Sequence, residues 1–397
     1  MPDASPQSRY ARFMRDSRRQ FLVRAALFAG GVALSGCAHR AARPLVYAPF
    51  NPAVPESACS IPPVHVAANR EIRTVVGLRP YRPSGFVVRA EKFGDTLVVH
   101  NYGHGGGGVT LSWGTARLAV DLGVPGYTGQ VAVLGSGAVG LATARLVQEA
   151  GLPVTIYTKA LPPNTTSNIA GAQWFPVTVS DPDRRTPEFN RQFVAAAQYA
   201  YTRYKLMIGP RYGIRWMRND FPRNADWIET GYTGMQSPLR SMMPELRDLT
   251  PQEHPFTGYA HVRQFDTMIV EPPVYLPAMV DDVVRAGGVI HVQQIHNIAE
   301  LQQLPQKLVF NCTGLGAREL FNDQELQPMR GQLTILLPQP EVEYAALPDD
   351  LYMFSRADGI VLGGTHDLGN WSLEPDAAQK ADILSRQQRF FSSFRSC

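Results

Sequence analysis

Residues 131–157 read VAVLGSGAVGLATARLVQEAGLPVTIY. An apolar strand leads into three glycines with the spacing GxGxxG, followed by an amphipathic helix and a second apolar strand. Gly135 suits the tight turn, Gly137 lets the backbone approach a pyrophosphate, and Gly140 lets the helix pack closely on the strand. The helix N-terminus adds a positive potential. A lone glycine motif is also compatible with a turn that binds nothing, but this complete βαβ unit predicts a Rossmann-like dinucleotide-binding domain.

The first 37 residues have the pattern of an export signal. The sequence SRRQFL (17–22) is a twin-arginine pattern, and the apolar stretch 23–34 is too short to span a bilayer stably. LSGC (34–37) resembles a lipoprotein cleavage site, which would make Cys37 the lipidated first residue. We therefore expect export by the twin-arginine route and a periplasmic protein anchored to the membrane by lipid. The alternative is an uncleaved N-terminal membrane anchor.

The charge of the chain is concentrated in this signal. The chain has 38 Lys and Arg against 34 Asp and Glu, and residues 1–36 hold six of those arginines and two of those aspartates. The remainder therefore has 32 residues of each sign, which gives no reason to expect nucleic acid as a partner. Residues 38–60, rich in Pro, Ala and small polar side chains, are typical of a tether, and residues 61–397 are long enough for two interleaved domains.

A second glycine-rich segment, HNYGHGGGGVTLSWG (100–114), precedes the fingerprint. Together with the fingerprint and five other blocks it resembles the D-amino acid oxidase family of FAD enzymes. The blocks are VAVLGSGAVGLATARL (131–146), NTTSNIAGAQWFP (164–176), LVFNCTGLGAREL (308–320), MRGQL (329–333), DGIVLGGTHDLGNWS (358–372), GLRPYRPSGF (77–86) and HNYGHGGGGVTLSWG (100–114). In the family the last two blocks close the chain, so this sequence resembles a circular permutant.

The resemblance implies an α/β fold in which a Rossmann-like FAD-binding domain is interleaved with a mixed-sheet, α+β substrate domain. Residues 121–130 would be the short loop that joins the helix of the second glycine segment to the first fingerprint strand. The segment 376–394 is expected to be a helix that ends beside the stretch after Cys59. Residues 95–180 and 260–320 would mainly bind FAD, and residues 77–92, 181–259 and 321–375 would mainly form the substrate domain.

The resemblance also implies which residues hold FAD, through backbone amides and hydroxyls at the pyrophosphate and backbone donors at the flavin ring. An ordinary helix cap is the alternative for Thr165–Ser167. No acid ends the second fingerprint strand, where Thr158 and Lys159 stand in place of the usual ribose-binding carboxylate, and no metal is expected. The implied cofactor residues are Gly135, Gly137, Ala138, Val139, Gly140, Thr165, Thr166, Ser167, Gly171, Ala172, Gln173, Trp174, Ile295, Thr313, Gly314, Gly105, Gly108, Val109 and Thr110.

The same resemblance implies three residues for the substrate site. Arg79 would clamp the α-carboxylate of a D-amino acid with its guanidinium fork, and Tyr352 would hydrogen-bond the same group. The carbonyl of Gly106 would accept from the amine. The second tyrosine that the family has in its lid has no counterpart, so a more open site is expected. Arg82 is expected to be structural, and so are His104 and His366.

The implied reaction passes the α-hydrogen as hydride to the flavin, and the imino acid then hydrolyses to a 2-oxo acid and ammonia. The flavin would be reoxidised by dioxygen, giving peroxide, or by another acceptor. Three alternatives stay open: a non-catalytic flavin-containing lipoprotein that binds D-amino acids, a D-aspartate- or glycine-type oxidase or dehydrogenase, and a nicotinamide enzyme in which Lys159 pairs with a 2′-phosphate.

The four cysteines divide by position. Cys37 is assigned to the lipid, and Cys312, at an apolar strand end beside the flavin, is expected to be a buried thiol. If the chain is permuted, Cys59 and Cys397 lie at neighbouring ends, and an oxidising compartment would favour a disulfide between them. Two unrelated thiols are the alternative.

Overall fold

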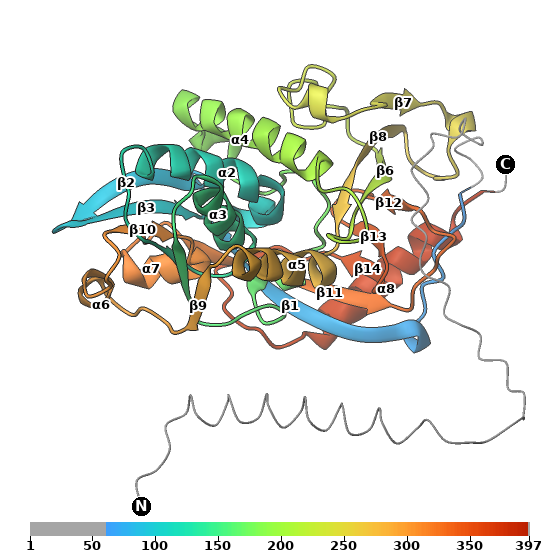
Figure 1. The fold of residues 1–397 in the computed structure, drawn as a ribbon. Coiled ribbons are helices and arrows are strands. Elements are labelled where there is room, and N and C mark those ends of the chain that lie inside the picture. The colour runs from blue at the N-terminus through green and yellow to red at the C-terminus, as the bar shows by residue number, and fades with distance from the viewer. Residues whose placement is uncertain (1–60, 396–397) are drawn as a thin grey trace, which may run out of the picture. The chain divides into compact units, whose positions relative to one another are not determined.

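A computed structural model of the chain describes residues 61–395. The signal, the tether, Cys37, and the predicted bridge from Cys59 to Cys397 lie outside the described residues. The described residues form two β-sheets with helices packed on them (Figure 1). Within residues 61–395, no helix has the length and apolar character that a membrane crossing requires.

The first sheet has six strands and contains the fingerprint. Its order is β2-β3-β10-β4-β5-β9, in which β2 pairs antiparallel with β3 and all other neighbours are parallel. Such a sheet with crossover helices is the α/β arrangement that the βαβ pattern predicts. The strands are β2 (Val87–Phe93), β3 (Thr96–Tyr102), β4 (Val131–Leu134), β5 (Val154–Thr158), β9 (Val289–Val292) and β10 (Leu308–Asn311).

Side chains alternate between the two faces of each strand, and other elements pack against both faces of this sheet. Val131 and Val133 of β4 pack in the large cluster that contains α2 and α3 residues, whereas Ala132 and Leu134 pack with Leu301 on the opposite face. The α-helices of the described residues, of which α8 packs on the second sheet, are α2 (Gly108–Gly123), α3 (Ala138–Glu149), α4 (Pro187–Lys205), α5 (Pro272–Arg285), α6 (Ile298–Gln302), α7 (Ala317–Leu320) and α8 (Ala377–Ser392).

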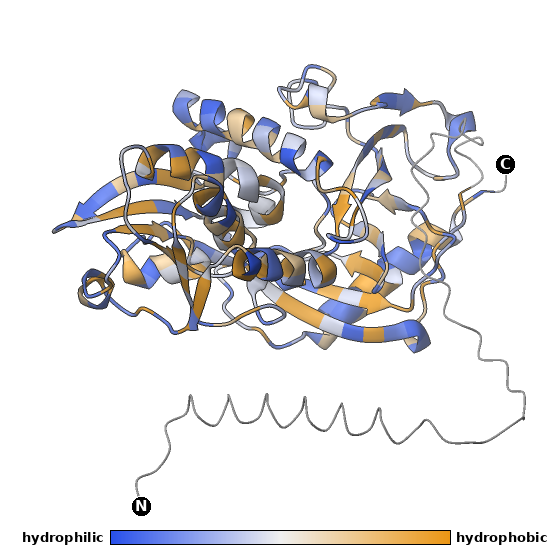
Figure 2. Cartoon of the chain, viewed as in Figure 1, coloured by the Kyte–Doolittle hydropathy of each residue, from blue (hydrophilic) through white to orange (hydrophobic). Residues whose placement is uncertain are grey.

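The second sheet has nine strands and is mixed. Its order is β1-β11-β14-β13-β12-β6-β8-β7, and β15 also pairs with β11; all pairs are antiparallel except β12 with β6. Hydrophobic and hydrophilic residues alternate along β1 (Figure 2). The strands are β1 (Glu71–Tyr81), β6 (Ile214–Arg223), β7 (Arg247–Leu249), β8 (His261–Val270), β11 (Gln327–Leu336), β12 (Tyr344–Ala346), β13 (Tyr352–Arg356), β14 (Gly359–Gly363) and β15 (Asp367–Leu368).

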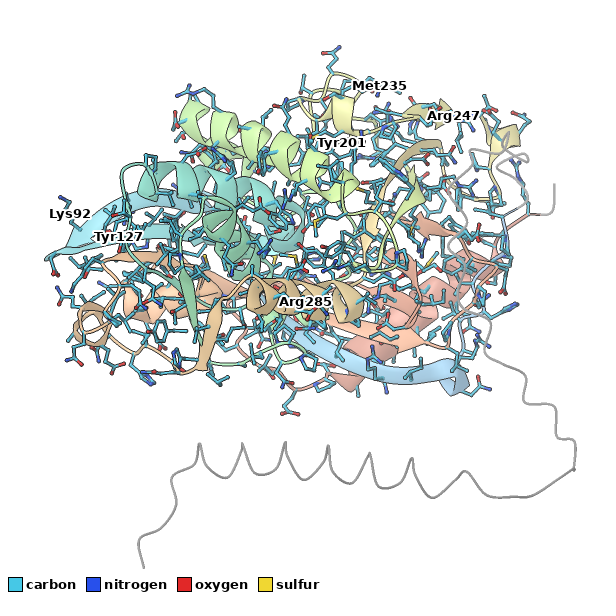
Figure 3. The ribbon with its side chains drawn as sticks, viewed as in Figure 1. Lys92, Tyr127, Tyr201, Met235, Arg247 and Arg285 are labelled. Atoms are coloured by element: carbon cyan, nitrogen blue, oxygen red, sulfur yellow. The ribbon has the colours of Figure 1, made fainter. Side chains whose placement is uncertain are left out.

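The chain passes repeatedly between the sheets, as an interleaved fold requires. The segments predicted from the sequence place two strands in one sheet, but the structure has each of them in the other sheet. β2 falls in the segment 77–92 but joins the six-stranded sheet, because it forms a hairpin with β3. β8 falls in the segment 260–320 but joins the nine-stranded sheet, because it pairs along its length with β6. The excursion between β6 and β8 carries Met235 and includes β7, which begins at Arg247 and pairs with β8 at the edge of the nine-stranded sheet (Figure 3).

Both ends of the described chain pack into one hydrophobic cluster. Ile61 and Val64 near the start, and Phe391 and Phe394 near the end, all contribute to it. The Tyr344 hydroxyl donates a hydrogen bond of 2.7 Å to the Pro62 carbonyl, which fixes the entering chain against the same region. The expected C-terminal helix is present as α8, with Asp376 as its N-cap. The residues after Cys59 and the end of this helix are therefore neighbours.

The contact of α2 with α4 predicts a sharp effect of one substitution. A Cβ atom added at Gly114 of α2 would lie 1.9 Å from the Ala196 carbonyl oxygen of α4, a backbone atom that cannot move aside alone. We expect Gly114→Ala to lower the free energy of unfolding by at least about 1–3 kcal/mol, as overpacking does. Thermal unfolding measures this, with Leu122→Ala on the exposed part of the same helix as control. Equal melting temperatures for both variants would contradict the packing argument.

Candidate functional site

A cavity of about 780 Å³ is lined by residues from both sheets. This volume suits a large organic ligand. The six-stranded sheet contributes the ends of β3, β4 and β5 and the loop that follows β10, and the nine-stranded sheet contributes β1, β11 and β13. The elements therefore meet at the carboxyl ends of parallel strands, where open α/β sheets bind ligands.

The fingerprint glycines have the steric roles that the sequence predicts. Gly135 has φ +103°, and a Cβ atom there would lie 2.6 Å from the Cys312 carbonyl oxygen. A Cβ atom on Gly140 would lie 2.1 Å from the Gly135 carbonyl oxygen. Gly137 is the N-cap of α3 and has no side chain over the helix end. The turn thus brings bare backbone and a helix N-terminus to the cavity, which is the arrangement that binds a pyrophosphate.

The segment 164–170 lies against this helix end. The backbone N–H of Ala138, in the first turn of α3, donates 3.0 Å to the Ser167 hydroxyl. Thr165 and Asn168 form a capping box for the short helix Thr166–Ile169, so the helix-cap interpretation holds for Thr165. All three hydroxyl residues, Thr165, Thr166 and Ser167, nevertheless line the cavity.

The second glycine segment ends in α2, whose first turn also faces the cavity. Gly105 has φ +54°, and a Cβ atom on it would lie 2.1 Å from the Thr178 carbonyl oxygen. The Gly106 N–H donates 3.0 Å to that same oxygen. The Thr110 hydroxyl lies 3.3 Å from the carbonyl oxygens of both Gln173 and Phe175, and so ties α2 to the segment 171–176.

Most of the residues that the sequence suggests for the site are brought together in this one cavity. Two are not. Gly140 lies behind the turn, and Trp174 is buried against Tyr201, with ring centroids 4.9 Å apart. Those that line the cavity are Arg79, Tyr352, Gly106, Gly135, Gly137, Ala138, Val139, Thr165, Thr166, Ser167, Gly171, Ala172, Gln173, Ile295, Thr313, Gly314, Gly105, Gly108, Val109 and Thr110.

Arg79 carries an unpaired positive charge into the cavity. Its Nη2 donates 3.3 Å to the Tyr352 hydroxyl and its Nη1 donates 3.0 Å to the Thr365 carbonyl. No carboxylate within residues 61–395 forms an ion pair with it. A Cβ atom on Gly331, in the paired strand, would lie 2.3 Å from Nη1, so a glycine is what makes room for the guanidinium. Arg79 is therefore held in place by neutral groups while its charge stays available to an anion.

Arg82, three residues later, shows the contrasting case. Its Nε lies 2.8 Å from Asp323 and its Nη2 lies 2.6 Å from Glu325. Because two carboxylates already neutralise this guanidinium, Arg82 has the structural role expected of it.

Three histidines line the cavity, His104, His296 and His366, and the pKa values of His104 and His366 are low enough to keep these two neutral near pH 7. Burial lowers the pKa of His104 to about 3, and its Nε2 lies 2.9 Å from the Thr115 hydroxyl while its ring stacks on Phe86. Burial, followed by the charge of Arg79, lowers the pKa of His366 to about 4. Neither imidazole offers a cation to a substrate at neutral pH, in agreement with the structural roles expected for both.

Lys159 occupies the position after β5 where a ribose-binding carboxylate is usual. It is exposed, lines the cavity and has no carboxylate partner within the described residues. The neighbouring hydroxyls of Ser136 and Thr158 are 3.0 Å apart and both donate to the Ala160 carbonyl. Glu319 is the one acid among the described residues that line the cavity.

Sequence reasoning missed the residues that form the wall beside Tyr352. Leu333, Leu347, Phe354 and Ile169 pack in one cluster with Tyr352 and all line the cavity. They come from segments far apart in the chain, so no local pattern marks them. Cys312 is a buried free thiol with its pKa raised to about 12 by burial, as expected. Within residues 61–395, no group of three or more His, Cys, Asp or Glu could hold a metal ion.

Comparison with known proteins places this geometry in a family. Residues 130–396 match the family described as FAD dependent oxidoreductase (DAO). The chain is 29% identical to a D-amino-acid oxidase of Rubrobacter xylanophilus over 260 residues, which cover 64% of this chain and 74% of that protein. It is 30% identical to a D-aspartate oxidase of Homo sapiens over 271 residues, which cover 65% of this chain and 75% of that protein.

The fold agrees with a solved structure as well. The chain resembles a glycine oxidase from Bacillus cereus ATCC 14579 with a TM-score of 0.51 and 16% identity, over 65% of this chain and 77% of that one. The matched family region contains the fingerprint and most of the cavity lining. This chain belongs to the DAO family of FAD dependent oxidoreductases.

Proposed function

We propose that this protein oxidises D-amino acids to 2-oxo acids and ammonia. One observation carries the proposal: the unpaired guanidinium of Arg79 lies beside the Tyr352 hydroxyl in the same cavity as the dinucleotide-binding turn. A carboxylate ligand held there would sit next to the cofactor. The relatives named D-amino-acid oxidase and D-aspartate oxidase support the amino acid as substrate and the D configuration.

The described residues fit FAD. A Cβ atom at Gly135 or Gly140 would collide with backbone, so the space at the turn exists because these residues are glycines. The N-termini of α2 and α3 both reach the cavity and supply positive potential. Gly137 and Ser167 lie at the α3 end, where the pyrophosphate would bind. When bound, FAD supplies the two-electron acceptor that the oxidation needs.

The chain itself contributes binding and alignment. Arg79 would hold the substrate carboxylate with two parallel N–H bonds, and the Tyr352 hydroxyl would donate to the same group. The Gly106 carbonyl would accept from the amine. Burial lowers the pKa of His104 and His366 and so makes both weak bases, and orientation of the Cα–H bond provides most of the rate.

The proposal extends to the electron acceptor and to the history of the chain. Reoxidation by dioxygen would produce peroxide, and a peroxide assay distinguishes this from another acceptor.

A circularly permuted origin is supported by the start of the family match at residue 130, after the blocks 77–86 and 100–114, and by the packing of Ile61 and Phe394 in one cluster. Export by the twin-arginine route with a lipid at Cys37 is proposed from the sequence alone.

Anaerobic flavin bleaching tests the function. The purified protein should be yellow, and a D-amino acid should bleach it while the L enantiomer does not. A yellow protein that no D-amino acid bleaches would favour a binding protein without turnover. A colourless protein that binds NADPH would overturn the proposal.

Substitution of Arg79 tests the carboxylate clamp. Arg79→Ala should leave the protein yellow but raise KM for the D-amino acid on the order of 30-fold to several thousand-fold, since a buried charged contact is worth about 2–5 kcal/mol. Arg73→Ala is the matched control, because Arg73 lies on the same strand but pairs with Asp358 at the surface. If both variants have wild-type KM, Arg79 does not bind the substrate.

Substitution of Lys159 tests the adenosine end of the site. Lys159→Glu restores the carboxylate that would accept from the ribose hydroxyls, and a hydrogen bond to a charged group contributes about 1.5–3 kcal/mol. We expect the Kd for FAD, measured by titration of the apoprotein, to fall about 10- to 100-fold. Lys92→Glu makes the same charge change at an exposed residue of β2, labelled in Figure 3, that does not line the cavity, and it should leave the Kd unchanged. An unchanged Kd for Lys159→Glu would separate Lys159 from the ribose.

The apolar wall predicts the side chain that the site prefers. Leu333, Leu347 and Phe354 lie beside Tyr352, and Arg79 and Lys159 are the only Lys or Arg among the described residues that line the cavity. Lys159 lies at the dinucleotide turn, so an acidic side chain beside Arg79 would find no second cation. We expect kcat/KM for D-asparagine to exceed that for D-aspartate, a substrate of nearly equal size, by tenfold or more. A preference for D-aspartate would require a cation that the described residues do not supply.

A further inference from the structure

Gln173 projects from a firmly held backbone into the cavity. The Trp174 N–H donates 2.7 Å to the Met268 carbonyl, and the Ala172 carbonyl accepts 2.9 Å from the Val270 N–H, so the segment around Gln173 is fastened to β8 on both sides. Gln173 itself is buried and lines the cavity. Its position is therefore set by the nine-stranded sheet and not by a free loop.

The buried Asn219 of β6 fixes which end of the Gln173 amide faces the cavity. The Asn219 Nδ2 donates 3.0 Å to the Met217 carbonyl, which can only accept. The Asn219 Oδ1 must then be the atom that meets Gln173, and it accepts from the Gln173 Nε2. Because Asn219 is fully buried, water cannot compete for these bonds. The amide of Gln173 is thus held in one of its two orientations.

The remaining atom, the Gln173 Oε1, is an unused acceptor. No described residue donates a hydrogen bond to this oxygen, and the oxygen is not completely enclosed by protein. Since the residue is otherwise buried and lines the cavity, this oxygen opens into the cavity. A neutral acceptor presented by two ordered amides calls for a ligand that brings an N–H donor.

We propose that Asn219 is a positioning residue that holds the Gln173 Oε1 as the hydrogen-bond acceptor for the substrate's amino group. This inference rests on the proposed oxidation of D-amino acids. Arg79 neutralises the carboxylate of such a substrate. Its amino group has at least two N–H bonds, so beside the Gly106 carbonyl it needs a second acceptor that adds no negative charge.

Paired ligands with and without the amino group test the inference. The Kd of D-alanine is obtained from the rate of anaerobic flavin reduction, and the Kd of propionate, which lacks the amino group, from the change that it causes in the flavin spectrum. We expect Gln173→Met to raise the Kd of D-alanine about 5- to 100-fold, as loss of one hydrogen bond does, and to change the Kd of propionate less than threefold.

The double variant tests the role of Asn219. Asn219→Leu alone should raise the Kd of D-alanine, and Asn219→Leu combined with Gln173→Met should raise it no further than Gln173→Met does, because Asn219 acts only through Gln173. Additive effects would overturn the positioning role. If Asn219→Leu does not fold, Gln173→Asn, which shortens the side chain and withdraws the acceptor from the same backbone position, replaces it in the paired measurement.

A buried glutamine outside the cavity provides the structural control. Gln264 of β8 is buried and bonds Asp220 without lining the cavity, so Gln264→Met should change both Kd values equally or not at all. If Gln173→Met weakens the binding of D-alanine and propionate equally, or alters the flavin spectrum without ligand, the Gln173 Oε1 contacts the flavin. That result would overturn this inference but not the proposed function. A wild-type protein that D-amino acids do not reduce would overturn the proposed function as well.

Discussion

The close approach of three backbone segments at the fingerprint is the constraint on which the rest of the site depends. Gly135 turns against Cys312 at the end of β10, and Gly140 of α3 packs on Gly135, with no room for a Cβ atom at either glycine. This contact joins β4, α3 and β10 in one rigid unit. It also clears the space above the strand ends and directs the N-terminus of α3 into it, so the dinucleotide end of the cavity follows from sterics.

The substrate end depends on the alternation of the chain between its two sheets. β1 places Arg79 in the nine-stranded sheet, and within a few residues the chain crosses to β2 and β3, which lead to the second glycine segment. Arg79 and the helix N-terminus of α2 are thereby connected by a short length of chain. Glycines again decide the geometry, since Gly331 makes room for the guanidinium and Gly363 for the Tyr352 ring.

Electrostatics distinguishes the two arginines of the segment GLRPYRPSGF. Arg82 is neutralised by Asp323 and Glu325, whereas Arg79 is held by a hydroxyl and a carbonyl. An arginine that is positioned by neutral groups keeps its full attraction for an anion, and His104 and His366, which burial keeps neutral, add no second positive charge that would compete for it. The cavity therefore presents in Arg79 a guanidinium that no carboxylate of the described residues neutralises.

The sequence predicts the βαβ unit and the glycine turns, because these depend on local spacing and on the absence of side chains at fixed positions. Most of the residues that line the cavity were predicted through the resemblance to the family. The resemblance also singled out Arg79, which lies in the block 77–86, and Tyr352, which lies ten residues before Leu362 in the block 358–372. Three features could be seen only in the tertiary structure. Trp174 lies outside the cavity, and Leu347 and Phe354 form the wall beside Tyr352. Strand β2 belongs to the six-stranded sheet and β8 to the nine-stranded sheet. The orientation of Gln173 by Asn219 belongs to the same class, because strand pairing between distant segments brings those side chains together and no local pattern records it.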